Sequence, residues 1–287
     1  MINAMAMTSI PPAIRPTISD KRRAFHQLHE SGCFVIPNPW DVGSALYLQH
    51  LGFKALASTC SGLSWSVGRA DNSLTRDQVL EHLHDLVAAT DIPVNADFES
   101  GFARTSEEVA VNVDLAVQAG VAGLSIEDST GNPANPLFDI DTAVARMRAA
   151  RRAIDVAGAE TLLVGRAEVF LVGPPNLDET IARLRAYSNA GADCLYAPGV
   201  QTREDIAAVV AAVAPKPFNL LAWGPDMTVS DAAALGVRRI SVGGSLSRAA
   251  WGGFMRAARR IAEDGRFDGY GDAASGKDLN ALFRDDP

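Results

Sequence analysis

The feature that most restricts the fold of this chain is a repeated unit in which a helix-like segment ends at a glycine and a short apolar run follows. The unit occurs five times, and its glycines are Gly52, Gly120, Gly158, Gly191 and Gly236. Glycine readily adopts the left-handed conformation that terminates many helices. The runs that follow are almost continuously apolar, which is typical of parallel strands buried on both faces. The pattern therefore predicts helices alternating with buried parallel strands.

Three further apolar runs complete a set of eight predicted strands, and they read CFVIPNP, IPVNAD and KPFNLLAW. Alanine-rich segments with helical periodicity separate the runs, so that one unit takes about 35 residues. Eight such units in 287 residues predict an α/β fold, the (β/α)8 TIM barrel. An open, doubly wound sheet is the alternative, but the GxGxxG fingerprint expected after its first strand is absent.

The chain divides into three expected regions. Residues 1–20 should form a flexible N-terminal tail, residues 21–264 the barrel with its site, and residues 265–287 a glycine- and charge-rich extension that leaves the barrel. The N-terminal segment lacks a basic start followed by a continuous apolar core, so it is not predicted to be a signal peptide. No run approaches the roughly 20 apolar residues of a membrane-spanning helix.

Charge and cysteine content restrict the partners. The net charge of −8 argues against nucleic acid or an anionic membrane, because both are bound through clustered Lys and Arg. The three cysteines are far apart and form neither a CxxC pair nor a zinc-binding spacing. This cysteine pattern is typical of a reduced, cytoplasmic protein. Because the net charge disfavours nucleic acid and membranes, the expected partner is a small molecule.

Acidic residues follow the predicted strands where they end, which in a barrel is the side that carries functional groups. Asp97 and Glu99 are two residues apart, so on a strand their side chains would point to the same face. Two carboxylates that close repel each other unless a cation lies between them, and oxygen ligands suit Mg²⁺ or Mn²⁺. Glu127, after the next strand, would complete such a site. The alternative is that these acids cap helices or pair with Arg104 and Arg166.

Two other strand ends carry candidate groups. Arg166 lies inside the apolar run LLVGRAEVF, where a guanidinium needs an anion, supplied by a substrate carboxylate or by Glu168 or Glu127. The segment ISVGGSLS resembles the phosphate cradle that some barrels build after the eighth strand. A plain turn with Ser245 as helix N-cap is the preferred interpretation there, because GG-S is a weak signal.

Several common chemistries lack their residues. All five histidines precede residue 85, so no Ser-His-Asp triad or HExxH zinc site can form at the later strand ends. A Schiff-base aldolase is disfavoured because no lysine lies at a predicted strand end, the lysines being Lys21, Lys54, Lys216 and Lys277.

Four segments in order resemble the isocitrate lyase/phosphoenolpyruvate mutase superfamily, over about residues 34–262. STCSGLSWSVGRADN is similar to that family's substrate loop, which implies that backbone amides of Ser61, Gly62 and Leu63 bind the substrate, with Asp71 matching an acid that follows the loop. NADFESGFA resembles the D-A-D-x-G-[FY]-G segment. This match makes Asp97 the principal metal ligand and Glu99 the second acid.

The remaining two segments of the resemblance concern the next two strands. GLSIEDS is similar to the strand that supplies an acid to the water shell of the metal, here Glu127. VGRAE resembles the A-R-T-D segment, so Arg166 would hold the substrate carboxylate. Asn219, which ends a later predicted strand, is a further predicted substrate contact. The resemblance implies Asp71, Glu127 and Arg166 as catalytic residues. It also implies Mg²⁺ (or Mn²⁺) as the metal. The implied assembly is a homotetramer whose C-terminal helices are exchanged between subunits, and a dimer is the alternative.

One departure from the family pattern bears on the reaction. Isocitrate and methylisocitrate lyases carry a K-[KR]-C-G-H loop with a catalytic cysteine, whereas residues 129–139 here read STGNPANPLFD. The predicted function is a Mg-dependent lyase or decarboxylase that cleaves a C–C bond of a small 2-oxo or 2-hydroxy carboxylate through an enolpyruvate-like intermediate. The alternatives are P–C bond chemistry of the phosphonomutase or phosphonopyruvate hydrolase type and a catalytically silent carboxylate-binding barrel.

Overall fold

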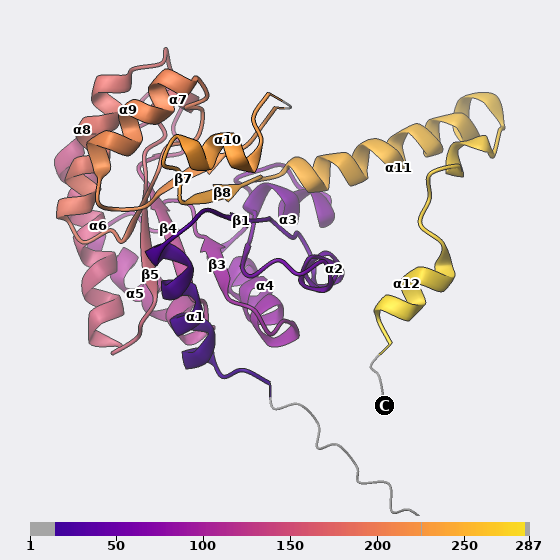
Figure 1. Ribbon diagram of the computed structural model, residues 1–287, viewed down its shortest axis with the longest axis horizontal. Helices are drawn as coiled ribbons and strands as arrows, with labels where there is room; N and C mark the ends of the chain where they lie inside the picture. The colour runs from indigo at the N-terminus through magenta and orange to yellow at the C-terminus, as the bar shows by residue number, and fades with distance from the viewer. Residues whose placement is uncertain (1–14, 225, 285–287) are drawn as a thin grey trace, which may run out of the picture.

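Eight parallel strands form a nearly closed barrel in the computed structural model, which describes residues 15–224 and 226–284 (Figure 1). The strands are β1 (Phe34–Ile36), β2 (Leu56–Ala57), β3 (Val94–Asp97), β4 (Gly123–Glu127), β5 (Leu162–Arg166), β6 (Cys194–Tyr196), β7 (Phe218–Leu221) and β8 (Arg239–Ser241). They pair in the order β1-β8-β7-β6-β5-β4-β3-β2. Between the two end strands, the Ala57 N–H donates to the Pro37 carbonyl at 3.0 Å. The predicted TIM barrel is confirmed.

Helices surround the barrel, except at the end of the chain, where they extend away from it (Figure 1). They are α1 (Ile18–Glu30), α2 (Val42–His50), α3 (Cys60–Ser66), α4 (Arg76–Ala89), α5 (Ser106–Gln118), α6 (Ile140–Val156), α7 (Val169–Val172), α8 (Leu177–Asn189), α9 (Arg203–Val213), α10 (Val229–Ala234), α11 (Ser245–Asp264), the 3-10 helix η1 (Asp268–Tyr270) and α12 (Gly276–Leu282). Short polar side chains cap many of them; Thr105, for example, accepts a hydrogen bond from the Glu108 amide at the start of α5. The five glycines of the repeated unit all have positive φ, as predicted.

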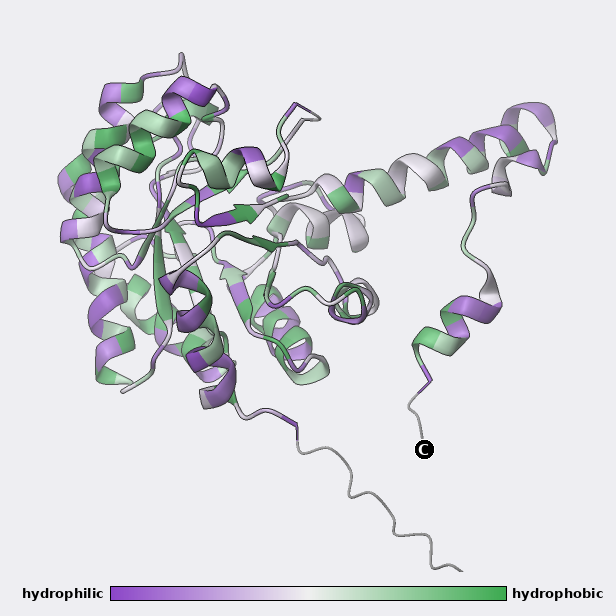
Figure 2. Ribbon diagram, in the orientation of Figure 1, coloured by the Kyte–Doolittle hydropathy of each residue, from purple (hydrophilic) through white to green (hydrophobic). Residues whose placement is uncertain are grey.

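The core of the barrel leaves one end open. A main cluster of buried apolar side chains fills the space between strands and outer helices, and Figure 2 shows long hydrophobic stretches on the strands, with hydrophilic positions among them. A second cluster joins Phe25 of α1 to Ala55, Ala122 and Leu162, which lie where β2, β4 and β5 begin. Helix α1 therefore packs against the N-terminal ends of the strands, and the C-terminal ends remain accessible.

The chain leaves the barrel earlier than the predicted boundary at residue 265. Helix α11 itself extends away from the barrel, and η1 and α12 follow it (Figure 1). Its N-cap is Gly244 and not Ser245, which is the first helical residue, so the preferred capping by Ser245 is wrong. At the other end, α1 begins at Ile18, inside the predicted tail 1–20, and residues 1–14 lie outside the described part. None of the described helices is long and apolar enough to cross a bilayer.

Acid should destabilise this fold partly through His82 of α4. Burial lowers the pKa of His82 to about 4, against the charges of Asp85 and Asp41, and its buried Nε2 has no hydrogen-bond partner in the described residues. The unfolded chain, with a pKa near 6.5, binds the proton more readily, so the free energy of unfolding falls as pH drops from about 6.5 to about 4. Replacing His82 with Gln should remove on the order of 1 kcal/mol of the stability loss between pH 7 and pH 5. Urea unfolding at both pH values measures this difference.

His84 provides the matched control because it lies on the same helix and is exposed, with 69% of its side chain accessible. His84→Gln should keep the wild-type pH dependence. If His82→Gln keeps it as well, the acid sensitivity has another source, such as His29, whose pKa burial lowers to about 3.

Candidate active site

A cavity of about 430 Å³ opens at the C-terminal ends of the strands. Its lining contains five carboxylates and three guanidinium groups: Asp71, Asp97, Glu99, Glu127, Glu168, Arg166, Arg239 and Arg248. Charged groups on or just after β3, β4, β5 and β8, together with Asp71 and Arg248, therefore border one cavity, with an excess of acids. Such a concentration at this end of a TIM barrel is typical of an active site.

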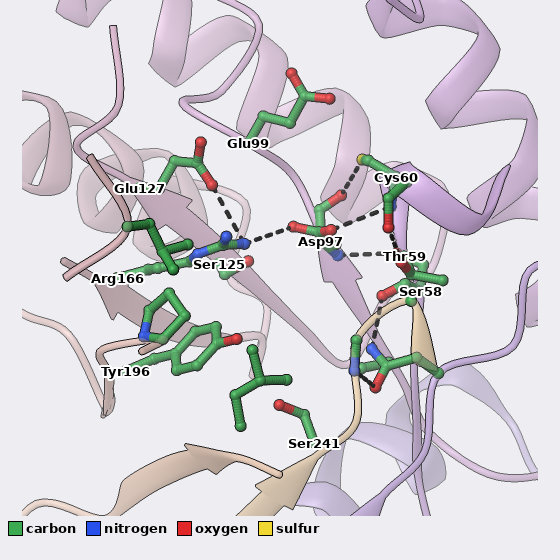
Figure 3. A pocket seen from close by; sticks show the side chains of 18 of the residues that line it. Ser58, Thr59, Cys60, Asp97, Glu99, Ser125, Glu127, Arg166, Tyr196 and Ser241 are labelled. Carbon is green, nitrogen blue, oxygen red and sulfur yellow. Dashed lines mark hydrogen bonds and ion pairs between the residues drawn. The ribbon is translucent and has the colours of Figure 1, made fainter. Parts of the chain in front are cut away.

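Arg166, the last residue of β5, contacts acids at three neighbouring strand ends, and Figure 3 shows its contacts with Asp97 and Glu127. Its Nε lies 2.5 Å from Glu168 Oε1, and its Nη1 lies 3.2 Å from both Asp97 Oδ1 and Glu127 Oε2. The guanidinium also lies over the ring of Tyr196, 5.2 Å from the ring centroid. Burial opposes the charge, but the three acids raise the pKa of Arg166. The guanidinium thus remains charged and holds the acids together.

The acids nevertheless exceed what this one guanidinium can neutralise. Burial raises the pKa of Glu127 well above its usual range, although Arg166 opposes the shift. Burial also raises the pKa of Glu99 to about 7, with a further contribution from the Asp97 charge. The Oε1 atom of Glu99 is buried and has no hydrogen-bond partner among the described residues. A second cation in this region would favour the ionised form of both groups.

Asp97 is fixed by the turn between β2 and α3. Its Oδ2 accepts a hydrogen bond from the Cys60 amide at 3.1 Å, and its own amide donates to Ser58 Oγ at 2.8 Å (Figure 3). The Cys60 thiol donates to the Asp97 carbonyl at 3.3 Å. Burial, and then the nearby acids, raise the pKa of this thiol well above its usual value. Cys60 therefore holds the turn in place and is a poor nucleophile.

Glu168 is positioned by a buried network that the sequence did not reveal. Asp128, directly after β4, accepts hydrogen bonds from the Glu168 amide at 2.8 Å and from Arg183 Nη1 at 3.1 Å. The Tyr187 hydroxyl donates to the same carboxylate at 2.5 Å. Asp128 is only 2% exposed, so these contacts are shielded from solvent. Helix α8, which carries Arg183 and Tyr187, thereby fixes the turn after β5.

Known proteins that are similar to this chain identify its family. The model of the phosphoenolpyruvate phosphomutase family matches residues 25–262, which is most of the chain. This chain belongs to the isocitrate lyase/phosphoenolpyruvate mutase superfamily. The predicted family is confirmed, and with it the predicted enzyme class, a carbon–carbon lyase of the isocitrate lyase/phosphoenolpyruvate mutase type.

Individual members of the superfamily are similar over most of their length. A Burkholderia cenocepacia J2315 protein, provisionally named a lyase/mutase, is 45% identical with a TM-score of 0.90, covering 93% of this chain and 97% of that one. Oxaloacetate decarboxylase of Paraburkholderia xenovorans (strain LB400) is 30% identical over 77% of this chain and 74% of its own. The structure of oxaloacetate acetylhydrolase in complex with the product oxalate has a TM-score of 0.83 at 26% identity, covering 94% and 95% of the two chains.

Most of the predicted site residues lie around the same cavity, namely Ser61, Asp71, Asp97, Glu99, Glu127, Arg166 and Asn219. The prediction that strand alternation places Asp97 and Glu99 on one face was wrong, however. Strand β3 ends at Asp97, and Glu99 has φ of 45°, in a left-handed turn beyond the strand. Asp97 therefore reaches the cavity from the last position of the strand and Glu99 from the turn that follows it, so strand alternation does not account for their proximity.

The predicted substrate-binding amides lie in the first turn of α3. The Gly62 amide donates to Thr59 Oγ1 at 3.4 Å, and the Leu63 amide donates to the Thr59 carbonyl at 3.0 Å. Of the three residues, Ser61 alone lines the cavity. A substrate contact of Gly62 and Leu63 therefore stays a prediction. It requires each amide to share its hydrogen atom between Thr59 and a ligand.

Residues 129–139, which replace the K-[KR]-C-G-H loop of the superfamily's lyases, fold back on themselves. Ser129 pairs with Leu137 in an antiparallel bridge, and the Thr130 amide donates to the Pro136 carbonyl at 2.9 Å. Within this segment, Ser129 is the residue that lines the cavity. The loop consequently places no thiol or acid beside the other charged groups.

A divalent cation fits the donor set at this site, although the protein alone does not supply a full ligand set. Within residues 15–224 and 226–284, no three His, Cys, Asp or Glu side chains are arranged to hold a metal ion together. The donors are carboxylate oxygens in excess of the cations, and one buried oxygen of Glu99 lacks a partner. Mg²⁺ commonly binds to one or two carboxylates and keeps several waters, which this arrangement permits.

Proposed function

We propose that this chain is a Mg²⁺- or Mn²⁺-dependent lyase that breaks a C–C bond of a small 2-oxo or 2-hydroxy carboxylate through an enolpyruvate-like intermediate. The observation that carries the proposal is the contact of Arg166 with Asp97, Glu127 and Glu168 in a cavity that retains an excess of carboxylates. The names of the decarboxylase and acetylhydrolase relatives support the same reaction class.

The metal belongs at the acidic side of the cavity. Asp97 is the proposed direct ligand, and Glu99 and Glu127 are the proposed acceptors for the waters of the metal. When bound, the cation would polarise the substrate carbonyl and stabilise negative charge on its oxygen. We propose Asp71, Glu127 and Arg166 as the catalytic residues, with Arg166 orienting the substrate carboxylate through Nη2, the nitrogen without a described partner.

Decarboxylation is the form of C–C cleavage that the loop favours. Loss of CO2 from a 2-oxo dicarboxylate leaves the electron pair of the broken bond on the third carbon, as an enolate. The Ser61 amide and the Asn219 amide group are the proposed donors to the ligand oxygens. A proton from water then converts the enolate into the 2-oxo acid. No thiol is needed for these steps, which agrees with the absence of Cys and His from residues 129–139.

Cleavage of a P–C bond is the second candidate, and the match to the phosphoenolpyruvate phosphomutase family favours it. The cavity lining contains no lysine. We rank this reaction below C–C cleavage, because relatives named oxaloacetate decarboxylase and oxaloacetate acetylhydrolase cover most of this chain. A silent carboxylate-binding barrel is the third candidate, and turnover separates it from the other two.

A coupled dehydrogenase assay for pyruvate tests the proposal. The panel contains oxaloacetate, methylated malates, isocitrate, methylisocitrate and phosphonopyruvate, each assayed with Mg²⁺ and with a chelator. For isocitrate, whose cleavage releases glyoxylate and succinate, glyoxylate is measured in place of pyruvate. We expect metal-dependent turnover of a C–C substrate. Turnover of phosphonopyruvate alone would move the assignment to the second candidate, and binding without turnover of any substrate would support the silent barrel.

Oligomer formation is a further part of the proposal. Helix α11 extends from the barrel with exposed apolar side chains at Trp251, Phe254, Met255 and Ile261. We propose that a second copy of the chain covers them, in a homotetramer or, as the alternative, a dimer. Light scattering on the purified protein measures the mass. A cytoplasmic location stays a prediction.

A further inference from the structure

A buried guanidinium without an acidic partner lies at the floor of the cavity. Arg239 of β8 is 3% exposed and belongs to the cavity lining. In the described part of the chain it forms no ion pair, whereas Arg166 contacts three acids. Burying a guanidinium without an anion is costly, and such a group is normally paired.

The partners of Arg239 are neutral amides from two other strands. Its Nε donates to Asn219 Oδ1 of β7 at 2.7 Å, and its Nη1 donates weakly to Asn95 Oδ1 of β3 at 3.4 Å. These contacts hold the guanidinium inside the barrel but leave its positive charge uncompensated. The charge is therefore available to a ligand in the cavity above it. Because Arg239 is buried, water screens the electrostatic interaction with such a ligand only weakly.

The same contacts determine what Asn219 can offer. Because Oδ1 accepts from Arg239, the amide group turns its Nδ2 away, and this nitrogen donates to Ser241 Oγ at 2.9 Å. Asn219 and Ser241 are both buried and both line the cavity. The floor is thus built from a cation and a side-chain amide held as a donor. In Figure 3, Ser241 lies on the side of Tyr196 away from Glu99 and Glu127.

We infer that Arg239, Asn219 and Ser241 form an anion subsite that receives the carboxylate that the substrate keeps. This inference rests on the proposed function in taking the ligand to be a small 2-oxo carboxylate. The proposed substrate has two carboxylates, one of which leaves as CO2. A cation bound to the departing carboxylate would stabilise the ground state and slow decarboxylation, so the subsite suits the carboxylate that is retained. Arg166 orients this same retained carboxylate through Nη2, and Arg239 supplies the full charge that Arg166, shared among three acids, lacks. Arg239 also positions Asn219.

The affinities for pyruvate and for its neutral amide, pyruvamide, show whether Arg239 binds the ligand carboxylate or only stabilises the fold. Dissociation constants for both are measured by ligand-observed NMR titration of the full-length protein in the presence of Mg²⁺. We expect Arg239→Met to reduce the preference for pyruvate over pyruvamide about tenfold or more, because a charge-assisted contact is lost. Arg239→Lys should retain part of the preference, since it keeps the charge. A structural role alone would weaken both ligands equally.

Two further variants keep the test decisive. Arg238, the neighbouring residue, donates to the Gly32 carbonyl at the surface, so Arg238→Met should preserve the wild-type preference. Asn219→Asp places an anion against Arg239 and should abolish the preference while the protein stays folded, which covers the case in which Arg239→Met does not fold. An unchanged preference in folded Arg239→Met or Asn219→Asp overturns the subsite. The titration does not depend on turnover, so failure of the proposed reaction is recognised separately.

Discussion

Replacing Arg166 with Met should lower the free energy of unfolding by about 3–5 kcal/mol, the usual cost of removing one partner from a buried ionic group. The substitution leaves Asp97, Glu127 and Glu168 close together without the guanidinium that holds them. Activity should be lost as well, because these acids would then repel each other. Urea unfolding of the wild type and the variant measures the change.

The pH dependence of this variant gives a second, independent readout. Burial raises the pKa of Glu127 and Glu168, and Arg166 opposes both shifts. Without Arg166 the folded state should take up protons at higher pH, so the stability deficit should be larger at pH 8 than at pH 5.5. Arg148 of α6 is an exposed control, and Arg148→Met should change stability by no more than about 0.5 kcal/mol. Equal stability of Arg166→Met and the wild type at pH 8 would contradict the central role of this guanidinium.

Asp97→Asn should reduce metal-dependent turnover by about 10²–10³-fold, the size of effect seen when one preorganised electrostatic group is removed. The side chain keeps its shape, so contacts with Cys60 and Ser58 at the end of β3 are largely retained. The melting temperature should therefore stay close to that of the wild type. The measurements are kcat/KM on the accepted substrate and the Mg²⁺ concentration at half-maximal rate.

Asp114→Asn is the matched control for this loss. Asp114 lies on α5 and accepts a hydrogen bond from Gln118 at the surface, outside the cavity. Its replacement should leave both rate and metal dependence unchanged. Full activity of Asp97→Asn in the presence of a chelator would rule out the metal-dependent mechanism.

This member of the superfamily differs from the lyases that use a loop cysteine in the segment that replaces that loop. Residues 129–139 close on themselves through the bridge between Ser129 and Leu137. The buried Cys60 does not replace the missing thiol, because burial raises its pKa. We therefore propose a reaction that expels CO2 and takes its proton from water.

Many features of the protein could be predicted from the sequence because they depend on neighbouring residues. Helix ends at glycine and apolar runs of strand length are local signals, and eight of them in alternation indicate a TIM barrel. Since functional groups of a TIM barrel lie at the strand ends, Asp97, Glu127 and Arg166 could be named as well. Glu99 also lines the cavity, although it does not lie on a strand as predicted. The left-handed turn that holds it has no equally clear sequence signal.

The contacts that set the charges of the site were decided by the tertiary structure. Arg239 meets Asn95 across 144 residues of chain, and Arg183 meets Asp128 across 55. A charged residue within the run GVRRISVGG was the one available signal for Arg239, but the sequence does not say which face of the barrel it joins or whether an acid is near. Local propensities determine that a strand forms and where it ends. Closure of the barrel determines which acceptors surround each buried donor, because it alone brings distant strands to within hydrogen-bonding distance.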